Sequence, residues 1–251
     1  MKAFARLLLL VLFSSLSLQL YFVGRIALMA VVDPESTAFE RSAVYSVAMT
    51  TGSLKWRQQW VPYSDISDNL KRAVIASEDA SFIEHDGVDI EALEKAWDKN
   101  AKEDAKAAQR SQQSTKNATA KPAKPAKPPK IIGGSTITQQ LAKNLFLSGE
   151  RTLLRKGQEL VLTLLLEKLL DKERILEIYL NSVEWGEGVF GAEAAAQYYY
   201  RKSASKLSAF ESARLAVMLP RPKYFETRPN SGYLSSRAGT IAARMSGVEL
   251  P

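Results

Sequence analysis

The apolar positions of this 251-residue chain form one continuous run near the N-terminus and several helical repeats farther on. Residues 7–23 carry no charge, and beyond Gly24 and Arg25 the sequence stays apolar as far as Val32. A helix rises about 1.5 Å per residue, so roughly 20 residues cross the hydrocarbon layer of a membrane. Residues 7–29 are therefore predicted to be a transmembrane anchor, with the Arg25 charge reaching the headgroups.

A cleaved signal peptide is the alternative for this run, and it would have a short apolar core followed by a site of small residues. The run continues past any such site, and Tyr21 and Phe22 lie near its end, so a retained anchor is favoured. Lys2 and Arg6 precede the run and favour a cytoplasmic tail at residues 1–6.

Helical spacing recurs through the rest of the chain and predicts an all-α fold. A first helix is expected after Ser67 or Asp68 as its cap, and a second helical piece after Gly87. The only alternating pattern longer than four residues is a weak stretch at 42–49, SAVYSVAM.

More helices are expected after residue 134, the first capped by Ser135 or Thr136. Asn181 is expected to close a later helix, and Pro220 follows the last. In the leucine-rich helix between them, the buried face is expected to consist of Leu160, Leu164 and Leu165.

Residues 98–130 differ in composition from everything around them. They contain no Val, Ile, Leu, Met, Phe, Trp or Tyr, and they end in KPAKPAKPPK. Such a segment buries too little apolar surface to offset its ordering entropy, so it is predicted to be a disordered insertion that touches anionic headgroups weakly. Its eight Lys and one Arg against three acids give +6 of the formal net charge of +7. The remainder is nearly neutral, which argues against nucleic acid as a partner.

Two residue types limit the chemistry. The chain has no cysteine, so disulfides and thiolate metal sites are excluded. It has one histidine, His85, which excludes a zinc site with several imidazole ligands.

Three polar motifs stand out against this background. In the first, Glu78 and Asp79 end an apolar helix and are followed by Phe82, His85 and the turn at Gly87. Proton transfer needs a carboxylate held against a hydroxyl, and burial near an aromatic ring raises a carboxyl pKa toward a usable value. A charged helix end with a glycine stop is the alternative interpretation.

The second motif, GGSTITQQLAKN at 133–144, places a glycine pair before a helix, where backbone N–H groups favour an anion. Thr136, Gln140 and Lys143 are four and three residues apart and share one helical face, which suits a sugar linked to phosphate. An ordinary helix cap is the alternative.

The third motif contains Arg151, Arg155 and Glu159. Arg155 and Glu159 are four residues apart, a spacing that most often gives a surface salt bridge. Glu159, however, adjoins a leucine-rich face, where a carboxylate needs a partner.

These motifs, in this order, closely resemble those of the family 51 glycosyltransferases, the peptidoglycan polymerases that use lipid II. The blocks ILEIYLN at 175–181 and GEGVFGAEAA at 186–195 agree with the resemblance, which covers roughly residues 55–230 around the insertion. It implies a connector at 30–54 and a glycosyltransferase domain at 55–251. The short remainder after the last helices leads us to expect a monofunctional enzyme without a transpeptidase domain.

The family resemblance implies an all-α lysozyme-like large lobe with a smaller membrane-proximal jaw. It implies an inverting reaction that joins the 4-hydroxyl of one N-acetylglucosamine to C1 of N-acetylmuramic acid, with release of undecaprenyl diphosphate. The expected partners are lipid II, the growing glycan strand, the membrane and other cell-wall synthesis and division proteins. The expected location is the bacterial inner membrane, with the catalytic domain on the periplasmic side.

The resemblance also implies roles for single residues. Glu78 is the expected general base, Asp79 supports the site, and Phe82 and His85 shape it. Glu159 is a second essential glutamate near the diphosphate. The cations expected on the diphosphate are Lys143, Arg151 and Arg155. The expected donor-site contacts are Ser135, Thr136, Gln140 and Asn144. No cofactor is implied as required, and a divalent cation, Mg²⁺ or Mn²⁺, near Glu159 stays open.

Two other functions compete with this interpretation. A lysozyme-like cell-wall hydrolase would also use one glutamate, but cleaving a glycan leaves no diphosphate for Lys143, Arg151 and Arg155 to stabilise. A non-catalytic membrane scaffold of the division machinery should lack Glu78, Lys143 or Glu159, and the sequence retains all of them.

Overall fold

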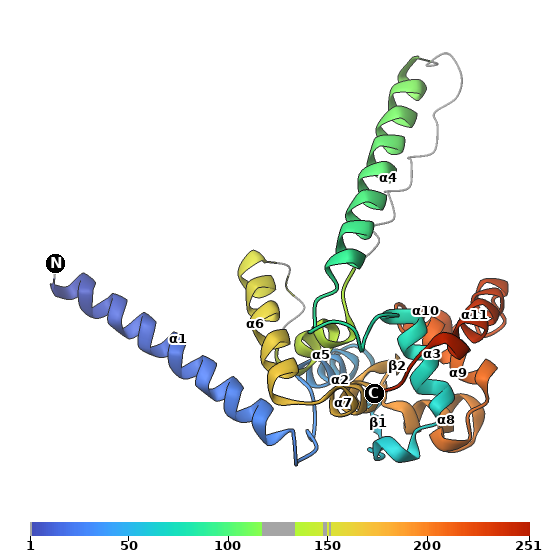
Figure 1. Ribbon diagram of the computed structural model, residues 1–251, viewed down its shortest axis with the longest axis horizontal. Coiled ribbons are helices and arrows are strands. Elements are labelled where there is room, and N and C mark those ends of the chain that lie inside the picture. The colour runs from blue at the N-terminus through green and yellow to red at the C-terminus, as the bar shows by residue number, and fades with distance from the viewer. Residues whose placement is uncertain (1, 117–133, 148–149, 151) are drawn as a thin grey trace. The chain divides into compact units, whose positions relative to one another are not determined.

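A computed structural model describes residues 2–116, 134–147, 150 and 152–251, and most of them are helical, with very little strand (Figure 1). The all-α class predicted from the sequence is therefore confirmed. The chain divides into two compact units: the first comprises Met1–Gly87 and Thr136–Pro251, and the second comprises Val88–Ser135.

The first unit holds nearly all the elements. Its α-helices are α1 (Lys2–Leu28), α2 (Ala38–Thr51), α3 (Asp68–Glu78), α5 (Ile137–Phe146), α6 (Leu153–Leu169), α7 (Lys172–Ser182), α8 (Ala192–Tyr200), α9 (Ala209–Met218), α10 (Pro222–Glu226) and α11 (Gly232–Arg244). Short 3₁₀ turns are η1 (Tyr63–Asp65), η2 (Ala204–Lys206) and η3 (Met245–Gly247), and the strands are β1 (Arg57–Gln58), β2 (Glu184–Gly186) and β3 (Val189–Phe190).

Helix α1 is long and apolar enough to cross a membrane, which agrees with the anchor predicted at residues 7–29. Most of its length is exposed, but Phe22 and Ile26 in its last turns, and Met29 directly after it, are buried. The Phe22 ring meets the edge of Phe146 from α5, with ring centroids 5.3 Å apart. The last turns of α1 are thus part of the folded body.

The core of the first unit forms around α3 and α5. Helix α3 packs against α9 and α11, and α5 packs against α2, α6 and α7. Ser67 caps α3 through its side chain, and Thr136 caps α5 in a capping box with Gln139. Both caps lie among the candidates expected from the sequence, and Thr136 belongs to the second polar motif.

A small sheet closes one side of this core, in the order β1–β3–β2, with β1 parallel and β2 antiparallel to β3. Gly188 precedes β3 with φ +73°, and a Cβ on it would lie 2.2 Å from the Lys55 carbonyl oxygen. Only glycine fits this close approach of two backbone segments. The stretch at 42–49, where the sequence shows weak strand alternation, belongs to α2 instead.

The second unit contains α4 (Ile90–Lys116). Residues 98–116 are therefore helical, and the disorder predicted for them is wrong. The segment is rich in Ala, Lys and Gln, which have high intrinsic helix propensity, and this preference forms a helix without an apolar face. The rest of the predicted insertion, 117–130, lies outside the described residues.

Two smaller expectations are also corrected. The buried residues of α6 are Glu159, Leu162, Thr163 and Leu166, whereas Leu160 and Leu164 are nearly half exposed and Leu165 is partly buried. Helix α6 is apolar over most of its circumference, so composition did not identify the inward side. Asn181 lies within α7 and does not close it; its side chain is fully buried and bonds the backbone of Val61 in both directions.

Candidate active site

Glu78 is the last residue of α3 and follows the buried residues 73–76 of that helix. Its Oε2 accepts a hydrogen bond of 3.1 Å from Gln140 Nε2, and Oε1 accepts a longer one of 3.5 Å from the Ser77 hydroxyl. Burial raises the pKa of the Glu78 carboxyl, these two hydrogen bonds oppose the rise, and the neighbouring Asp79 adds to it. A carboxyl of raised pKa with one face toward solvent suits a proton acceptor.

Gln140 from α5 is oriented by a third residue. Its Oε1 accepts a hydrogen bond of 3.1 Å from the Tyr179 hydroxyl, so its Nε2 faces Glu78. Tyr179 is fully buried, and burial raises its pKa well above the ordinary value, so the hydroxyl keeps the proton that it donates. The amide therefore acts as a donor to Glu78 in a fixed direction.

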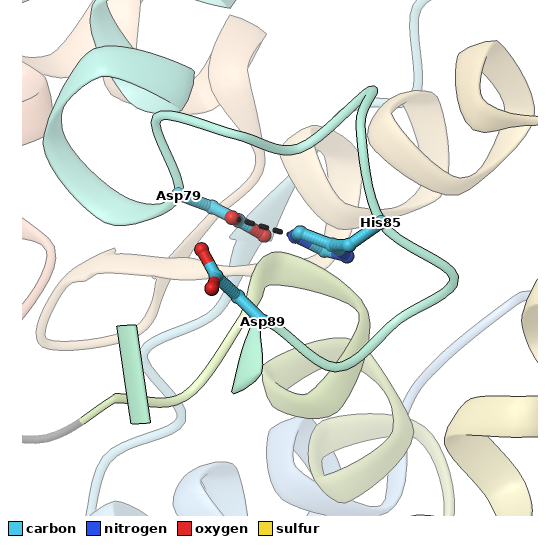
Figure 2. Close-up of side chains that lie close together, drawn as sticks. All are labelled: Asp79, His85 and Asp89. Atoms are coloured by element: carbon cyan, nitrogen blue, oxygen red, sulfur yellow. Dashed lines mark hydrogen bonds and ion pairs between the residues drawn. The ribbon is translucent and has the colours of Figure 1, made fainter. Parts of the chain in front are cut away.

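Asp79 fastens the loop after α3 to the start of α5. Its Oδ1 lies 2.9 Å from His85 Nε2 (Figure 2). Its Oδ2 accepts a hydrogen bond of 2.9 Å from the Ile137 amide. His85 Nδ1 accepts from the Gly87 amide, so the ring hydrogen is on Nε2 and points to Asp79. A carboxylate at a helix N-terminus is also favoured by the helix dipole.

Phe82 and Thr136 complete this loop. Phe82 is fully buried, and its ring meets the edge of the His85 ring. The Thr136 hydroxyl donates a hydrogen bond of 2.6 Å to the Gly87 carbonyl, besides capping α5. The structure thus brings together the first motif and the start of the second.

Glu159 on α6 is buried and bonded to two cations. Its Oε2 accepts a hydrogen bond of 2.7 Å from Arg155 Nη1, and its Oε1 accepts one from Lys156 Nζ. The spacing of Arg155 and Glu159 therefore forms a largely buried pair and not a surface one. Within the part of the chain that the structure describes, Arg155 Nε is buried without a hydrogen-bond partner. A buried N–H of this kind is costly unless a ligand accepts from it.

Lys143 on α5 is exposed and lies within electrostatic reach of the α6 group. Partial desolvation lowers the pKa of Lys143, Glu159 opposes this, and the charges of Arg155 and Lys156 lower it further. Three cations around one carboxylate leave a net positive charge, which suits an anionic ligand.

Three further residues were predicted for the site from the sequence. Asn144 is buried in α5, and Ser135 is exposed at the end of the second unit. Arg151 lies outside the described residues. The sequence interpretation missed Lys156 and the orienting hydroxyl of Tyr179. The i,i+3 spacing of Lys156 from Glu159 was a usable signal, whereas the Tyr179 contact depends on how two helices pack.

A carboxyl of raised pKa held by an amide, with a cation cluster on the adjoining helices, suits the transfer of a group away from an anionic leaving group. The sequence matches the family model described as transglycosylase over residues 46–127 and 127–246. The chain belongs to the transglycosylase family and is a glycosyltransferase. The two matched segments meet at residue 127, inside the Lys- and Pro-rich segment.

Several similar proteins carry the same name, biosynthetic peptidoglycan transglycosylase. The one from Burkholderia thailandensis is 54% identical over 236 residues, which cover 94% of this chain and 83% of that protein. The one from Burkholderia pseudomallei is 53% identical over the same shares. The one from Paraburkholderia phytofirmans is 52% identical over 237 residues, 94% of this chain and 88% of that protein.

Proposed function

We propose that this enzyme polymerises the glycan strands of peptidoglycan from lipid II and releases undecaprenyl diphosphate. One observation carries the proposal: helix α5 connects a carboxyl of raised pKa, Glu78, to a group of cations. Gln140 on this helix holds Glu78, and Lys143, less than one turn farther on, belongs to the cluster around Glu159. The names of the similar proteins supply the class of substrate.

Glu78 is the proposed general base. Its carboxylate takes the proton from the 4-hydroxyl of the acceptor N-acetylglucosamine, and the hydroxyl oxygen attacks C1 of the donor N-acetylmuramic acid. The bond from C1 to the diphosphate oxygen breaks, its electron pair leaves with the diphosphate, and the configuration at C1 inverts. Proton transfer by a positioned carboxylate contributes typically 10²- to 10⁴-fold to rate.

Lys143 and Arg155 are proposed to stabilise the charge on the leaving diphosphate. Positive groups that are already held in position stabilise the charge that develops in the transition state. They therefore lower the activation barrier without reorganisation of the site. The buried Arg155 Nε supports this role because a phosphate oxygen would supply its acceptor. The roles predicted from the sequence for Arg151, Ser135 and Thr136 stay predictions. Glu159 holds Arg155 and Lys156 in place.

No metal is proposed as required. Both Glu159 oxygens accept hydrogen bonds from side-chain cations, which leaves this carboxylate poorly suited to a Mg²⁺ or Mn²⁺ ligand in the state described. The cations would then supply the charge that a metal supplies elsewhere. Loss of polymerisation on treatment with EDTA, restored by Mg²⁺ or Mn²⁺, would contradict this.

Helix α1 is proposed to anchor the enzyme in the inner membrane, with the catalytic unit on the periplasmic side. Lipid II carries a long prenyl chain, and each CH₂ withdrawn from lipid costs about 0.8 kcal/mol. A substrate of this kind stays in the bilayer, so an anchored enzyme meets it in two dimensions. Contacts with other cell-wall synthesis and division proteins stay a prediction.

The test is incubation of the full chain with labelled lipid II, beside Glu78→Gln and Glu84→Gln variants, with products separated by size. Glu84 is an exposed acid in the same loop and serves as the matched control. We expect lysozyme-sensitive polymer from the wild type and the Glu84→Gln protein, and about 10³-fold less from Glu78→Gln. Intact lipid II with no polymer from the wild type would refute the proposed function and favour a scaffold.

A further inference from the structure

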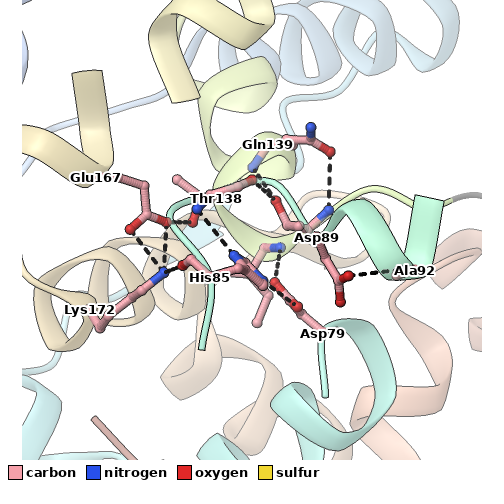
Figure 3. Close-up of polar contacts among 11 residues, drawn as sticks. Asp79, His85, Asp89, Ala92, Thr138, Gln139, Glu167 and Lys172 are labelled. Carbon is pink, nitrogen blue, oxygen red and sulfur yellow. Dashed lines mark hydrogen bonds and ion pairs between the residues drawn. The ribbon is translucent and has the colours of Figure 1, made fainter. Parts of the chain in front are cut away.

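Lys172, the first residue of α7, holds the loop that follows Glu78. Its Nζ donates a hydrogen bond of 2.6 Å to the His85 carbonyl oxygen and one of 2.9 Å to Glu167 Oε1 (Figure 3). The same ammonium lies 4.7 Å from the centre of the Phe82 ring. One side chain therefore contacts two residues of the loop and a carboxylate on α6.

Glu167 is itself fixed from another helix. Its Oε1 accepts a hydrogen bond of 2.6 Å from the hydroxyl of Thr138, a fully buried residue of α5. The exposed fraction of the side chain is 8% for Glu167 and 20% for Lys172, so this ion pair is far less screened than a surface pair. Helices α5, α6 and α7 thus converge on one pair of charges.

The loop depends on such contacts from outside because residues 79–87 form no regular helix or strand. Gly87 has φ +83°, and a Cβ on it would lie 2.7 Å from Thr163 Cγ2 and 2.8 Å from Glu167 Cγ. The loop therefore lies directly against the α6 residue that binds Lys172. Its first residue, Asp79, follows Glu78 without a break, so a displaced loop displaces the base.

We propose that Lys172 and Glu167 form a positioning pair for the reaction, holding the 79–87 loop so that Glu78 meets the acceptor hydroxyl. The role in catalysis rests on the proposed function, whereas the restraint on the loop does not. Neither residue is assigned to touch substrate. Their effect passes through the His85 carbonyl, the Phe82 ring and the backbone that joins them to Glu78.

The experiment compares Lys172→Met, which keeps the stem and removes the charge, with Lys172→Arg, which keeps the charge, and with Glu167→Gln. Lys168→Met is the matched control, because Lys168 is an exposed lysine next to Glu167. Two measurements are made on each full-length protein: kcat and KM for lipid II polymerisation, and hydrogen exchange of the amides at 82–87, with α9 as internal reference.

We expect kcat of Lys172→Met to fall about 30-fold with KM changed less than about threefold, since misplacement of a base affects the chemical step. Lys172→Arg should recover most of the loss, and Lys168→Met should match the wild type. Exchange at 82–87 should quicken in Lys172→Met while exchange in α9 stays unchanged. The double variant with Glu167→Gln should lose no more than Lys172→Met alone.

A Lys172→Met enzyme with kcat within twofold of the wild type would overturn the proposal. So would a fall in kcat without quicker exchange at 82–87, because the ammonium would then act on substrate directly. If Lys172→Met does not fold, Glu167→Gln is judged by the same two measurements. A wild type that makes no polymer refutes the proposed function, and the exchange measurement still tests the restraint on the loop.

Discussion

Helices α3 and α4 follow one another in the chain and are helical for opposite reasons. In α3, six of 11 residues are buried, among them Leu70, Ala73 and Val74. In α4, which has 27 residues, Ile90, Leu93 and Trp97 are exposed, and Ala96 is buried. Helix α3 is held by tertiary packing, whereas α4 is held by the intrinsic preference of its Ala, Lys and Glu residues.

This difference explains where the candidate base lies. A helix that is fixed by its neighbours presents its last residue at one place, and that residue in α3 is Glu78. A helix that is stabilised only by intrinsic propensity frays easily and does not hold other residues in position. The consequence is that substitutions at the end of α3 should affect stability and activity together, and substitutions at exposed positions of α4 should affect neither.

Among substitutions that should leave a folded protein, the largest combined loss of stability and activity is expected from Asp79→Leu. The buried amide of Ile137 would lose its acceptor, and His85 Nε2 would lose its Asp79 partner, at a cost of about 3 kcal/mol in the free energy of unfolding. Polymerisation should fall more than about 100-fold because the loop is released. Denaturant unfolding and the lipid II assay measure both, with Asp86→Ala, an exposed acid in the same loop, as control. Equal stability of Asp79→Leu and wild type would contradict the anchoring role.

An intermediate effect is expected from Gln140→Leu, read from the pH dependence of kcat. The proposed base, Glu78, would act as a carboxylate, so activity should rise with pH through its pKa, which burial raises. The Gln140 hydrogen bond lowers that pKa, so its removal should move the acidic limb to higher pH and lower the rate near neutrality. Ser77→Ala should shift the limb less, because its contact is longer, at 3.5 Å. A limb that moves to lower pH would refute this account.

The smallest effect is expected from a proline in α4. Ala101→Pro should remove helical signal in circular dichroism but leave polymerisation within about twofold, because α4 is exposed along its described surface around residue 101. The same change in α3, Ala73→Pro, removes a backbone hydrogen bond in a fully buried turn and should prevent folding. If Ala101→Pro abolished activity, α4 would have a role that its composition does not indicate.

The sequence predicted those features that depend on local pattern. The caps Ser67 and Thr136, the all-α class and the apolar N-terminal helix all follow from residue type and spacing. The side of α6 that faces inward did not follow, because Leu160 and Leu162 are chemically equivalent and only tertiary packing distinguishes them. The error at 98–116 had another cause: the absence of a core was treated as the absence of a helix.

The candidate site also has features that the sequence predicted and features that it did not. The residues of each motif were found along the chain, and the structure brings Glu78, Gln140 and Asp79 together through contacts that sequence spacing alone cannot give. Lys172 could not be found because its partners, the His85 carbonyl and Glu167, come from different elements. Positions that act through packing leave little trace in a single sequence.

The buried end of α1 has a consequence for the order in which the protein is made. Phe22 rests on Phe146, and the Met29 carbonyl accepts a hydrogen bond of 2.8 Å from Arg174 Nε. Both partners leave the ribosome more than 100 residues after α1. Helix α1 is thus synthesised well before the residues that bury its C-terminal end, and that end acquires its contacts only after α7 has been made.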